Sequence, residues 1–199
     1  MNTYLSSSII FYNNKITTKL QETYGNIEIP VMMDWEDSLM SASAAYVTEG
    51  GGDILEIGFG MGISAGYMHS HSINSHTIVE NHPEIIPKAV EWASNKSNVT
   101  IVSQSWMEWM DEFTIEENEN LLTFDGIFYD TYGDDDMVYF SSSLSELVKS
   151  GTKVTWWNNE SSETNFYNIP NVTYQVFNVN PPENTYFNST TYYLPMKGF

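Results

Sequence analysis

Short apolar segments alternate with segments of helical spacing between residues 53 and 157, and this alternation limits the folds open to the chain. The apolar segments are the expected strands, at 53–58, 77–80, 99–102, 124–130 and 153–157. Helices are expected between them, over 63–71, 83–93 and 137–148. Because a helix between two strands returns the chain to the same edge of the sheet, such strands run parallel. The pattern predicts an α/β domain with a mostly parallel sheet.

The two ends of the chain follow other patterns. Residues 172–177 and 190–194 alternate between apolar and polar positions, and a loop rich in Pro and Asn joins them. Neighbouring strands without a crossover helix are antiparallel, so we expect a C-terminal hairpin. The first 30 residues are polar and aromatic without a clear period, which indicates an N-terminal arm or lid before a domain over 31–199. Apolar spacing predicts a helix over 32–47.

The charge of the chain excludes several classes of partner. Its 199 residues include 26 acidic and 7 basic ones, and the basic ones are all lysine, which gives a net charge of −19. Binding of nucleic acid or an anionic membrane needs clustered basic side chains, so we expect neither partner. The chain has no cysteine, and its four histidines lack the spacing of a metal site. No segment resembles a signal peptide or a membrane span, so we expect a cytoplasmic protein.

A glycine-rich turn joins the first expected strand to the helix that follows. Residues 56–62 read Glu-Ile-Gly-Phe-Gly-Met-Gly, and glycine lets a backbone turn tightly and approach a ligand closely. Glu80 ends the next strand, where an acid can accept hydrogen bonds from both hydroxyls of a ribose. Ile63 stands where a dinucleotide-binding turn needs a small residue, and Glu56 would repel phosphates but attract a sulfonium or ammonium group. The turn favours S-adenosylmethionine over a dinucleotide, and the alternative is a tight turn without a ligand.

Acidic side chains also follow the fourth expected strand. Asp130 lies in the sequence Tyr-Asp-Thr-Tyr at residues 129–132, at the carboxyl end of that strand. In open α/β sheets ligands bind at this edge, so Asp130 is a candidate functional residue. A helix cap is the alternative role for Asp130, and residues 134–136 are expected to be solvated charge.

Four segments together resemble the guanidinoacetate N-methyltransferase family. They are Val-Met-Met-Asp-Trp-Glu at 31–36, Leu-Glu-Ile-Gly-Phe-Gly-Met at 55–61, Ile-Val-Glu-Asn at 78–81 and Phe-Asp-Gly-Ile-Phe-Tyr-Asp-Thr-Tyr at 124–132. Their order and spacing match that family from about residue 31 to residue 157, and the tail resembles its closing hairpin. The resemblance implies a Rossmann-like class I methyltransferase fold. This fold has a mostly parallel seven-stranded sheet with a C-terminal antiparallel hairpin and helices on both faces.

The resemblance also implies roles for individual residues. S-adenosylmethionine would be the cofactor, and Glu36 and Asp130 would be the catalytic residues that hold the guanidino group of the substrate. The residues expected to contact the cofactor are Met32, Met40, Glu56, Gly58, Phe59, Gly60, Met61, Gly62, Ile63, Ser64, Glu80, Asn81, His82, Gln104, Ser105, Trp106 and Asp130.

The chemistry of a guanidino group agrees with paired acids. A guanidinium is a poor nucleophile until it loses a proton, and two carboxylates can hold its planar fork and accept that proton. At the far end of the substrate, Asn159, Glu160 and Ser161 stand where the family has a Thr-Ser pair that binds a carboxylate. Glu160 and Ser161 would contact the substrate, and Glu160 would disfavour a carboxylate unless its side chain faces solvent. We therefore expect guanidinoacetate to be a poorer substrate than a guanidine with a neutral or cationic tail.

The sequence thus predicts N-methylation of a small guanidino compound, guanidinoacetate or an analogue, by a monomer or homodimer. One alternative is an arginine side-chain N-methyltransferase that acts on protein, which the negative charge of the chain would suit. A further alternative is a catalytically silent protein that binds S-adenosylmethionine. The presence of both Glu36 and Asp130 argues against a silent protein.

Overall fold

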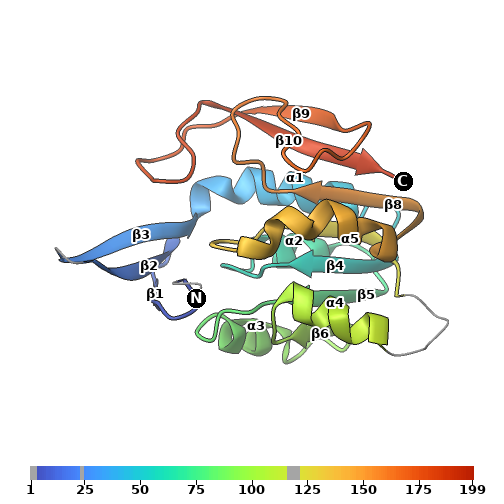
Figure 1. The fold of residues 1–199 in the computed structure, drawn as a ribbon, viewed down its shortest axis with the longest axis horizontal. Helices are drawn as coiled ribbons and strands as arrows, with labels where there is room; N and C mark the ends of the chain where they lie inside the picture. Colours follow the sequence, from blue (N-terminus) through green and yellow to red (C-terminus); the bar gives the residue numbers. More distant parts are fainter. Residues whose placement is uncertain (1–3, 23–24, 116–121) are drawn as a thin grey trace.

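A seven-stranded sheet forms the centre of the computed structural model, which describes residues 4–22, 25–115 and 122–199 (Figure 1). The strand order is β6-β5-β4-β7-β8-β10-β9. The strands are β4 (Asp53–Ile57), β5 (Ser75–Val79), β6 (Val99–Val102), β7 (Phe124–Tyr129), β8 (Val148–Trp156), β9 (Thr173–Asn178) and β10 (Thr191–Gly198). The first five run parallel, and β10 is antiparallel to both β8 and β9. The predicted Rossmann-like sheet with its C-terminal hairpin is confirmed.

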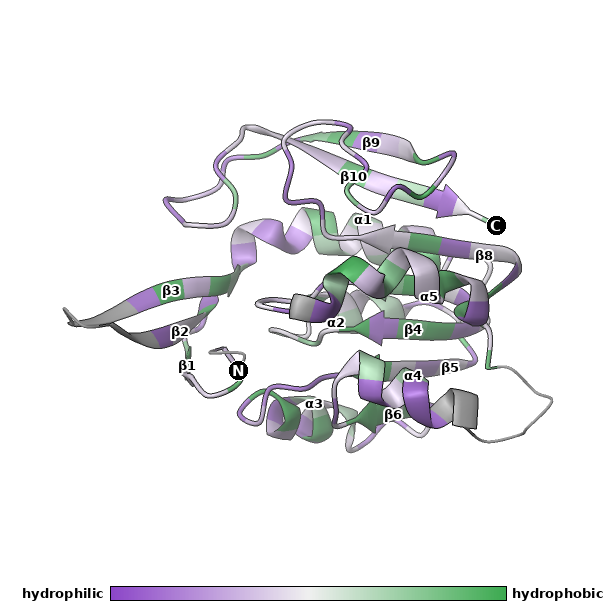
Figure 2. Ribbon diagram, in the orientation of Figure 1, coloured by the Kyte–Doolittle hydropathy of each residue, from purple (hydrophilic) through white to green (hydrophobic). Residues whose placement is uncertain are grey.

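Helices cover both faces of this sheet. α1 (Asp37–Val47), α2 (Ile63–Ser70) and α3 (Ile86–Ala93) contribute buried residues to one apolar cluster. α4 (Trp106–Ile115) and α5 (Phe140–Leu147) contribute to a second cluster. Successive strand residues enter opposite clusters, as Ile54 and Leu55 do in β4, because side chains alternate across a strand. Figure 2 shows this pattern as apolar residues concentrated in the central strands and the helices against them.

Three helices begin later than the sequence predicts. Met32 belongs to strand β3 (Gly25–Met33), and a 3-10 turn, η1 (Asp34–Glu36), precedes α1, so the helix expected over 32–47 starts at Asp37. The helix expected over 83–93 starts at Ile86 as α3, and Pro87 lies in its first turn. α5 starts at Phe140 because another 3-10 turn, η2 (Asp135–Tyr139), takes up the first residues of the expected helix. Tight turns before each helix, and for α1 also the end of β3, carry apolar residues that fit a helical period.

The N-terminal segment is a separate three-stranded antiparallel sheet. β1 (Ser8–Phe11), β2 (Lys15–Glu22) and β3 pair in that order, and Figure 1 shows them projecting from one side of the larger sheet. The sequence indicated only an irregular arm, and β3 continues past Pro30, where the arm was expected to end. Pro30 is tolerated because β3 is an edge strand and because β3 bulges beside it, where Ile16 pairs with Met32, Thr17 pairs with Pro30 and Val31 is the extra residue. The role of the N-terminal segment as a lid stays a prediction.

Within the described ranges, none of the helices has the length and apolar character that crossing a membrane requires.

Candidate active site

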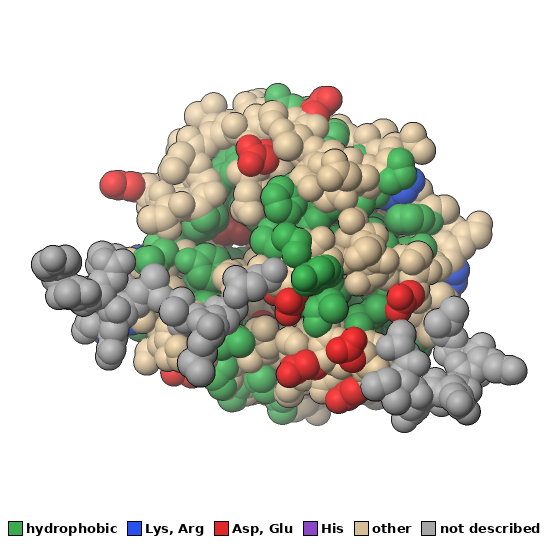
Figure 3. All heavy atoms as spheres, viewed as in Figure 1, with side chains coloured by type: hydrophobic (Ala, Val, Ile, Leu, Met, Phe, Trp, Pro, Cys, Tyr) green, Lys and Arg blue, Asp and Glu red, His purple; other side chains and the backbone are tan. Residues whose placement is uncertain are grey.

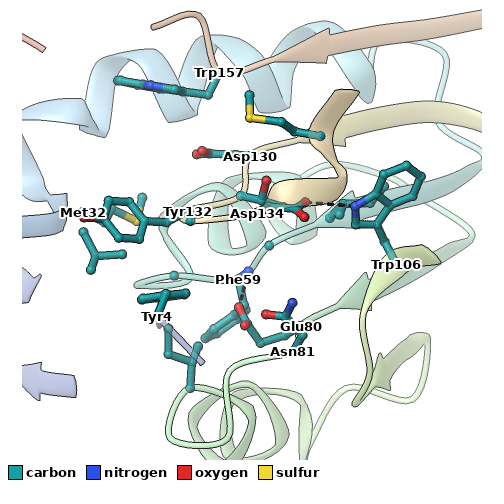
Figure 4. A pocket seen from close by; sticks show the side chains of 18 of the residues that line it. Tyr4, Met32, Phe59, Glu80, Asn81, Trp106, Asp130, Tyr132, Asp134 and Trp157 are labelled. Carbon is teal, nitrogen blue, oxygen red and sulfur yellow. Dashed lines mark hydrogen bonds between the residues drawn. The ribbon is translucent and has the colours of Figure 1, made fainter. Parts of the chain in front are cut away.

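A cavity of about 490 Å³ opens at the carboxyl ends of β4, β5 and β7. It combines residues that follow these strands with Tyr4 and Met32 from the N-terminal segment and Tyr186 from the loop between β9 and β10. Eleven of the residues predicted from the sequence line it: Met32, Glu36, Gly58, Phe59, Gly60, Ser64, Glu80, Asn81, Gln104, Trp106 and Asp130. In Figure 4 Asp130 lies on the side of Trp157, whereas Glu80 and Asn81 lie beyond Phe59.

The glycine-rich turn after β4 allows two close approaches of the backbone. Gly58 has φ +95°, and a Cβ there would lie 1.9 Å from the carbonyl oxygen of Asp130. Gly60 has φ +53°, and its Cβ would lie 2.7 Å from Sδ of Met32. The backbone N–H of Asp130 also donates to the carbonyl of Ile57 at 2.9 Å. Larger residues at these glycines would push the turn away from Asp130 and Met32. The shape of the cavity therefore requires glycine at both positions.

Glu80 presents a fixed carboxylate at the end of β5. Its Oε2 accepts the N–H of Phe59 at 2.9 Å and its Oε1 accepts the N–H of His82 at 2.8 Å. Burial raises the pKa of Glu80, and the backbone donors of His82 and Phe59 oppose that shift. Each carboxylate oxygen has more than one lone pair, so both can still accept a hydroxyl from the cavity. This is the geometry needed to hold the two hydroxyls of a ribose.

His82 contacts Tyr4 and so holds the N-terminal segment beside Glu80. Its Nδ1 accepts the N–H of Glu84 at 3.2 Å, so Nε2 is the protonated nitrogen in the neutral ring and donates to the carbonyl of Tyr4 at 3.2 Å. The ring of Tyr4 lies 4.7 Å from that of His82 and 4.9 Å from that of Tyr132, between centroids. His82 therefore supports the wall that Tyr4 forms and does not itself line the cavity.

Glu36 and Asp130, called the acid pair below, both line the cavity. The side chain of Glu36 is buried, and burial raises its pKa to about 7 against hydrogen bonds from Tyr186 and Met33 that lower it. Burial also raises the pKa of Asp130 well above its usual range, and the charges of Glu36 and Glu56 add to the effect. Like charges in a buried site disfavour joint ionisation, whereas a cation between them favours it. The acid pair is therefore suited to a cationic ligand.

Trp106 lines the cavity away from the acid pair, and Asp134 holds its side chain. Its indole N–H donates to Oδ2 of Asp134 at 2.9 Å, as the dashed line in Figure 4 marks. The hydroxyl of Tyr129 donates to the same oxygen at 2.6 Å, so Asp134 fixes two aromatic rings. The sequence indicated only solvated charge at residues 134–136, but Asp134 lines the cavity. Trp106 thus contributes a fixed indole to the cavity lining, to which Gln104 also belongs.

Nine predicted site residues lie outside the cavity lining: Met40, Glu56, Met61, Gly62, Ile63, His82, Ser105, Glu160 and Ser161. Glu56 is fully buried beneath the glycine-rich turn, where Ser64 donates to its Oε1 and Nε2 of His76 lies 3.0 Å from its Oε2. Its charge thus meets protein groups and not an incoming sulfonium. Met40 packs in the core along α1. Glu160 and Ser161 are exposed, and Asn159 is the residue of that loop that reaches the cavity.

Sequence reasoning missed part of the wall. Tyr132 belongs to a segment that carried the family resemblance, and Trp157 ends the range over which the spacing of that family matches, so the sequence could have indicated both. Tyr4, Thr185 and Tyr186 also line the cavity. They lie in polar, aperiodic stretches without a motif, and only the fold brings them to Asp130 and Glu36.

Comparison with known proteins identifies the family of this chain. The model of the guanidinoacetate N-methyltransferase family matches residues 12–161. "Protein arginine N-methyltransferase 2" of Kluyveromyces lactis is 29% identical over 97% of the chain and 52% of its own length. The protein of the same name from Candida glabrata is 31% identical over 67% of the chain and 31% of its own length. The chain thus spans about half, or less, of the length of the curated relatives it matches.

Solved structures share the fold at low sequence identity. Spermidine synthase from Thermotoga maritima has a TM-score of 0.60 at 13% identity, over 96% of this chain and 72% of that one. A putative methyltransferase complexed with S-adenosylhomocysteine has a TM-score of 0.60 at 9% identity, over 96% of this chain and 56% of that one. The chain belongs to the guanidinoacetate N-methyltransferase family and has the Rossmann-like fold of class I methyltransferases, with S-adenosylmethionine as its cofactor.

Proposed function

We propose that this chain transfers a methyl group from S-adenosylmethionine to a nitrogen of a small guanidino compound. The observation that carries the proposal is the acid pair. Glu36 and Asp130 come from distant parts of the sequence and line one cavity. Burial raises the pKa of both, and the charge of Glu36 adds to the shift of Asp130. A guanidinium is the cation whose planar fork best matches two carboxylates.

The residues around the other end of the cavity fit the cofactor. Glu80 would hold the ribose hydroxyls, Asn81, Gln104 and Trp106 would surround the base, and the turn at residues 58–60 leaves room for close approach. The cavity volume of about 490 Å³ lies within the usual range for small-molecule sites. When bound, the cofactor supplies a methyl group on a positively charged sulfur.

The acid pair would act in two ways on the substrate. The carboxylates orient the guanidinium, so that one nitrogen faces the methyl group. As the new N–C bond forms and the S–C bond breaks, that nitrogen must lose a proton, and a carboxylate with a raised pKa accepts it. The proton that the carboxylate accepts would carry away the positive charge that the methyl donor brings to the site. Burial of Glu36 and Asp130 thus supports both binding and base catalysis.

Methyl transfer with labelled cofactor tests the proposal. Glu36→Gln and Asp130→Asn should each lower turnover on a guanidine by at least about 100-fold. Affinity of Glu36→Gln for S-adenosylhomocysteine should change little. A double variant that retains activity would exclude a two-carboxylate mechanism.

Protein arginine is a second candidate substrate, because the curated relatives carry that name and the chain has a net charge of −19. Arginine presents the same guanidino group to the acid pair. An arginine-containing basic peptide should be compared with free guanidines in the same assay. Preferential labelling of the peptide would favour the second candidate.

The negative charge of the cavity lining affects which substrate tails can bind, both for a small guanidine and for protein arginine. The lining carries the acids Glu36, Glu80, Asp130 and Asp134, and it contains none of the seven lysines. Glu160, expected to repel a carboxylate directly, is exposed and outside the lining. The preference for an uncharged or cationic tail therefore depends on the summed negative charge of the lining and not on that side chain.

A further inference from the structure

Tyr186 lies next to Glu36 in space although the loop between β9 and β10 carries it. Its hydroxyl donates to Oε1 of Glu36 at 2.5 Å and accepts the indole N–H of Trp35 at 3.1 Å. An indole N–H can only donate, and a phenol has a single proton, so Trp35 directs that proton toward Glu36. Burial and the charge of Glu36 raise the pKa of Tyr186 far above neutral, which keeps the hydroxyl a donor.

The remaining contacts of Glu36 determine which oxygen faces the cavity. The N–H of Met33 also donates to Oε1, at 2.9 Å. Both hydrogen bonds to this carboxylate from the described part of the chain thus fall on Oε1. Oε2 is left as the oxygen that can hold a ligand.

The loop itself is internally fixed. Oδ1 of the buried Asn184 accepts the N–H groups of Tyr186 at 2.9 Å and Phe187 at 2.7 Å. Its Nδ2 donates to the carbonyls of Pro182 and Phe187, both at 2.8 Å. The ring of Tyr186 also stacks on Trp35, with centroids 6.3 Å apart and planes at 23°. Tyr186 is therefore preorganised and does not depend on a ligand for its position.

We propose that Tyr186 is a positioning residue for Glu36: it anchors Oε1, turns Oε2 to the cavity and favours the ionised carboxylate. The catalytic consequence rests on the proposed function, whereas the effect on ionisation does not. Loss of the hydroxyl should raise the pKa of Glu36 further above about 7, because a donor to the charged form is lost. The other ionisable groups that face Glu36 are Asp130 from the end of β7 and Tyr192 from β10, and Glu56 acts on Asp130 in turn.

The variant Tyr186→Phe tests the proposal through two readouts. Carbon NMR of the labelled Glu36 carboxyl, identified by its absence in Glu36→Gln, should show a midpoint at least about half a pH unit higher than in the wild type. In kinetics, kcat/KM for a guanidine at pH 7 should fall about 10- to 100-fold and recover partly at higher pH. S-adenosylhomocysteine affinity should stay the same.

A matched control and a second variant make the outcomes decisive. Tyr67→Phe removes the same kind of hydroxyl from an exposed carboxylate, Asp37, at 2.9 Å, and should change neither readout. If Tyr186→Phe fails to fold, Trp35→Phe should move the midpoint of Glu36 in the same direction by a smaller amount. An unchanged midpoint in the folded variant overturns the proposal. A raised midpoint in an enzyme whose wild type methylates no guanidine refutes the proposed function alone.

Discussion

Glu36 is a buried carboxyl group, and ionisation of such a group opposes folding. Its pKa is about 7 in the folded chain against an ordinary value of 4.5, a difference of about 2.5 units. Each unit corresponds to about 1.4 kcal/mol, so at pH 8.5 the ionised side chain destabilises the folded state by about 3 kcal/mol. At pH 5 most of that cost is absent, because the buried group holds its proton, and about 1 kcal/mol remains.

Glutamine removes this cost and keeps the local hydrogen bonds. In Glu36→Gln the amide oxygen can still accept the N–H of Met33 and the hydroxyl of Tyr186. The variant should therefore be more stable than the wild type by about 3 kcal/mol at pH 8.5 and about 1 kcal/mol at pH 5. For a chain of this size the higher value is a rise in Tm of about 6 to 12 °C.

Thermal unfolding of the two proteins at pH 5 and pH 8.5 checks the prediction. The sign follows from linkage: a raised pKa in the folded state means that stability is lost as pH rises through about 7. Glu146→Gln, at an exposed position of α5, should show no comparable gain at either pH. A stability difference between Glu36→Gln and the wild type that does not grow with pH would refute the reasoning.

Four further predictions follow from the cavity. Glu80→Gln should weaken S-adenosylhomocysteine binding about 10- to 100-fold in calorimetry, because the amide donor would face the N–H of either Phe59 or His82; unchanged affinity would contradict this. Gly58→Ala should destabilise the chain by about 3 kcal/mol or more through its contact with Asp130, whereas Gly66→Ala, with nothing within 4 Å, should not; equal Tm values would count against it. Binding of a guanidinium at pH 7 should release protons from the acid pair, seen as a calorimetric heat that depends on the buffer, and a heat independent of buffer would argue against raised pKa values. Guanidinoacetate should have a kcat/KM about 10-fold or more below that of a guanidine with an uncharged tail, and the reverse order would show that the negative lining does not govern the far end.

The sequence predicts the sheet and the floor of the cavity well, because both depend on local signals. The alternation of apolar segments sets β4 to β8, and the glycines after Ile57 mark the turn that approaches Asp130. The family motifs identify Glu36 and Asp130, which the fold brings to one cavity. Each of these signals lies within a few consecutive residues, so it can be recognised without knowledge of the fold.

The parts that the sequence did not predict depend on contacts between distant residues. Glu56 sits where a ligand-facing acid was expected, but Ser64 and His76 surround it, and nothing in their spacing indicates that pairing. The bulge in β3 next to Pro30 shifts the alternation of side chains along that strand, and the pairing of β1, β2 and β3 was not indicated by any motif. Tyr186 contacts Glu36 across 150 positions of sequence.

Because β10 lies between β8 and β9, the parts of the site form in a definite order during translation. β9 joins the larger sheet only by pairing with β10, which is made after it. While the ribosome is still adding residues 191–198, β9 has no partner strand, and the loop that carries Tyr186 is not yet closed at both ends. The strands that hold Glu80 and Asp130 are complete well before that point. In a nascent chain the part of the cavity around Glu80 and Asp130 can therefore form first. The hydrogen bond from Tyr186 to Glu36 can form only after β10 has paired with β8 and β9.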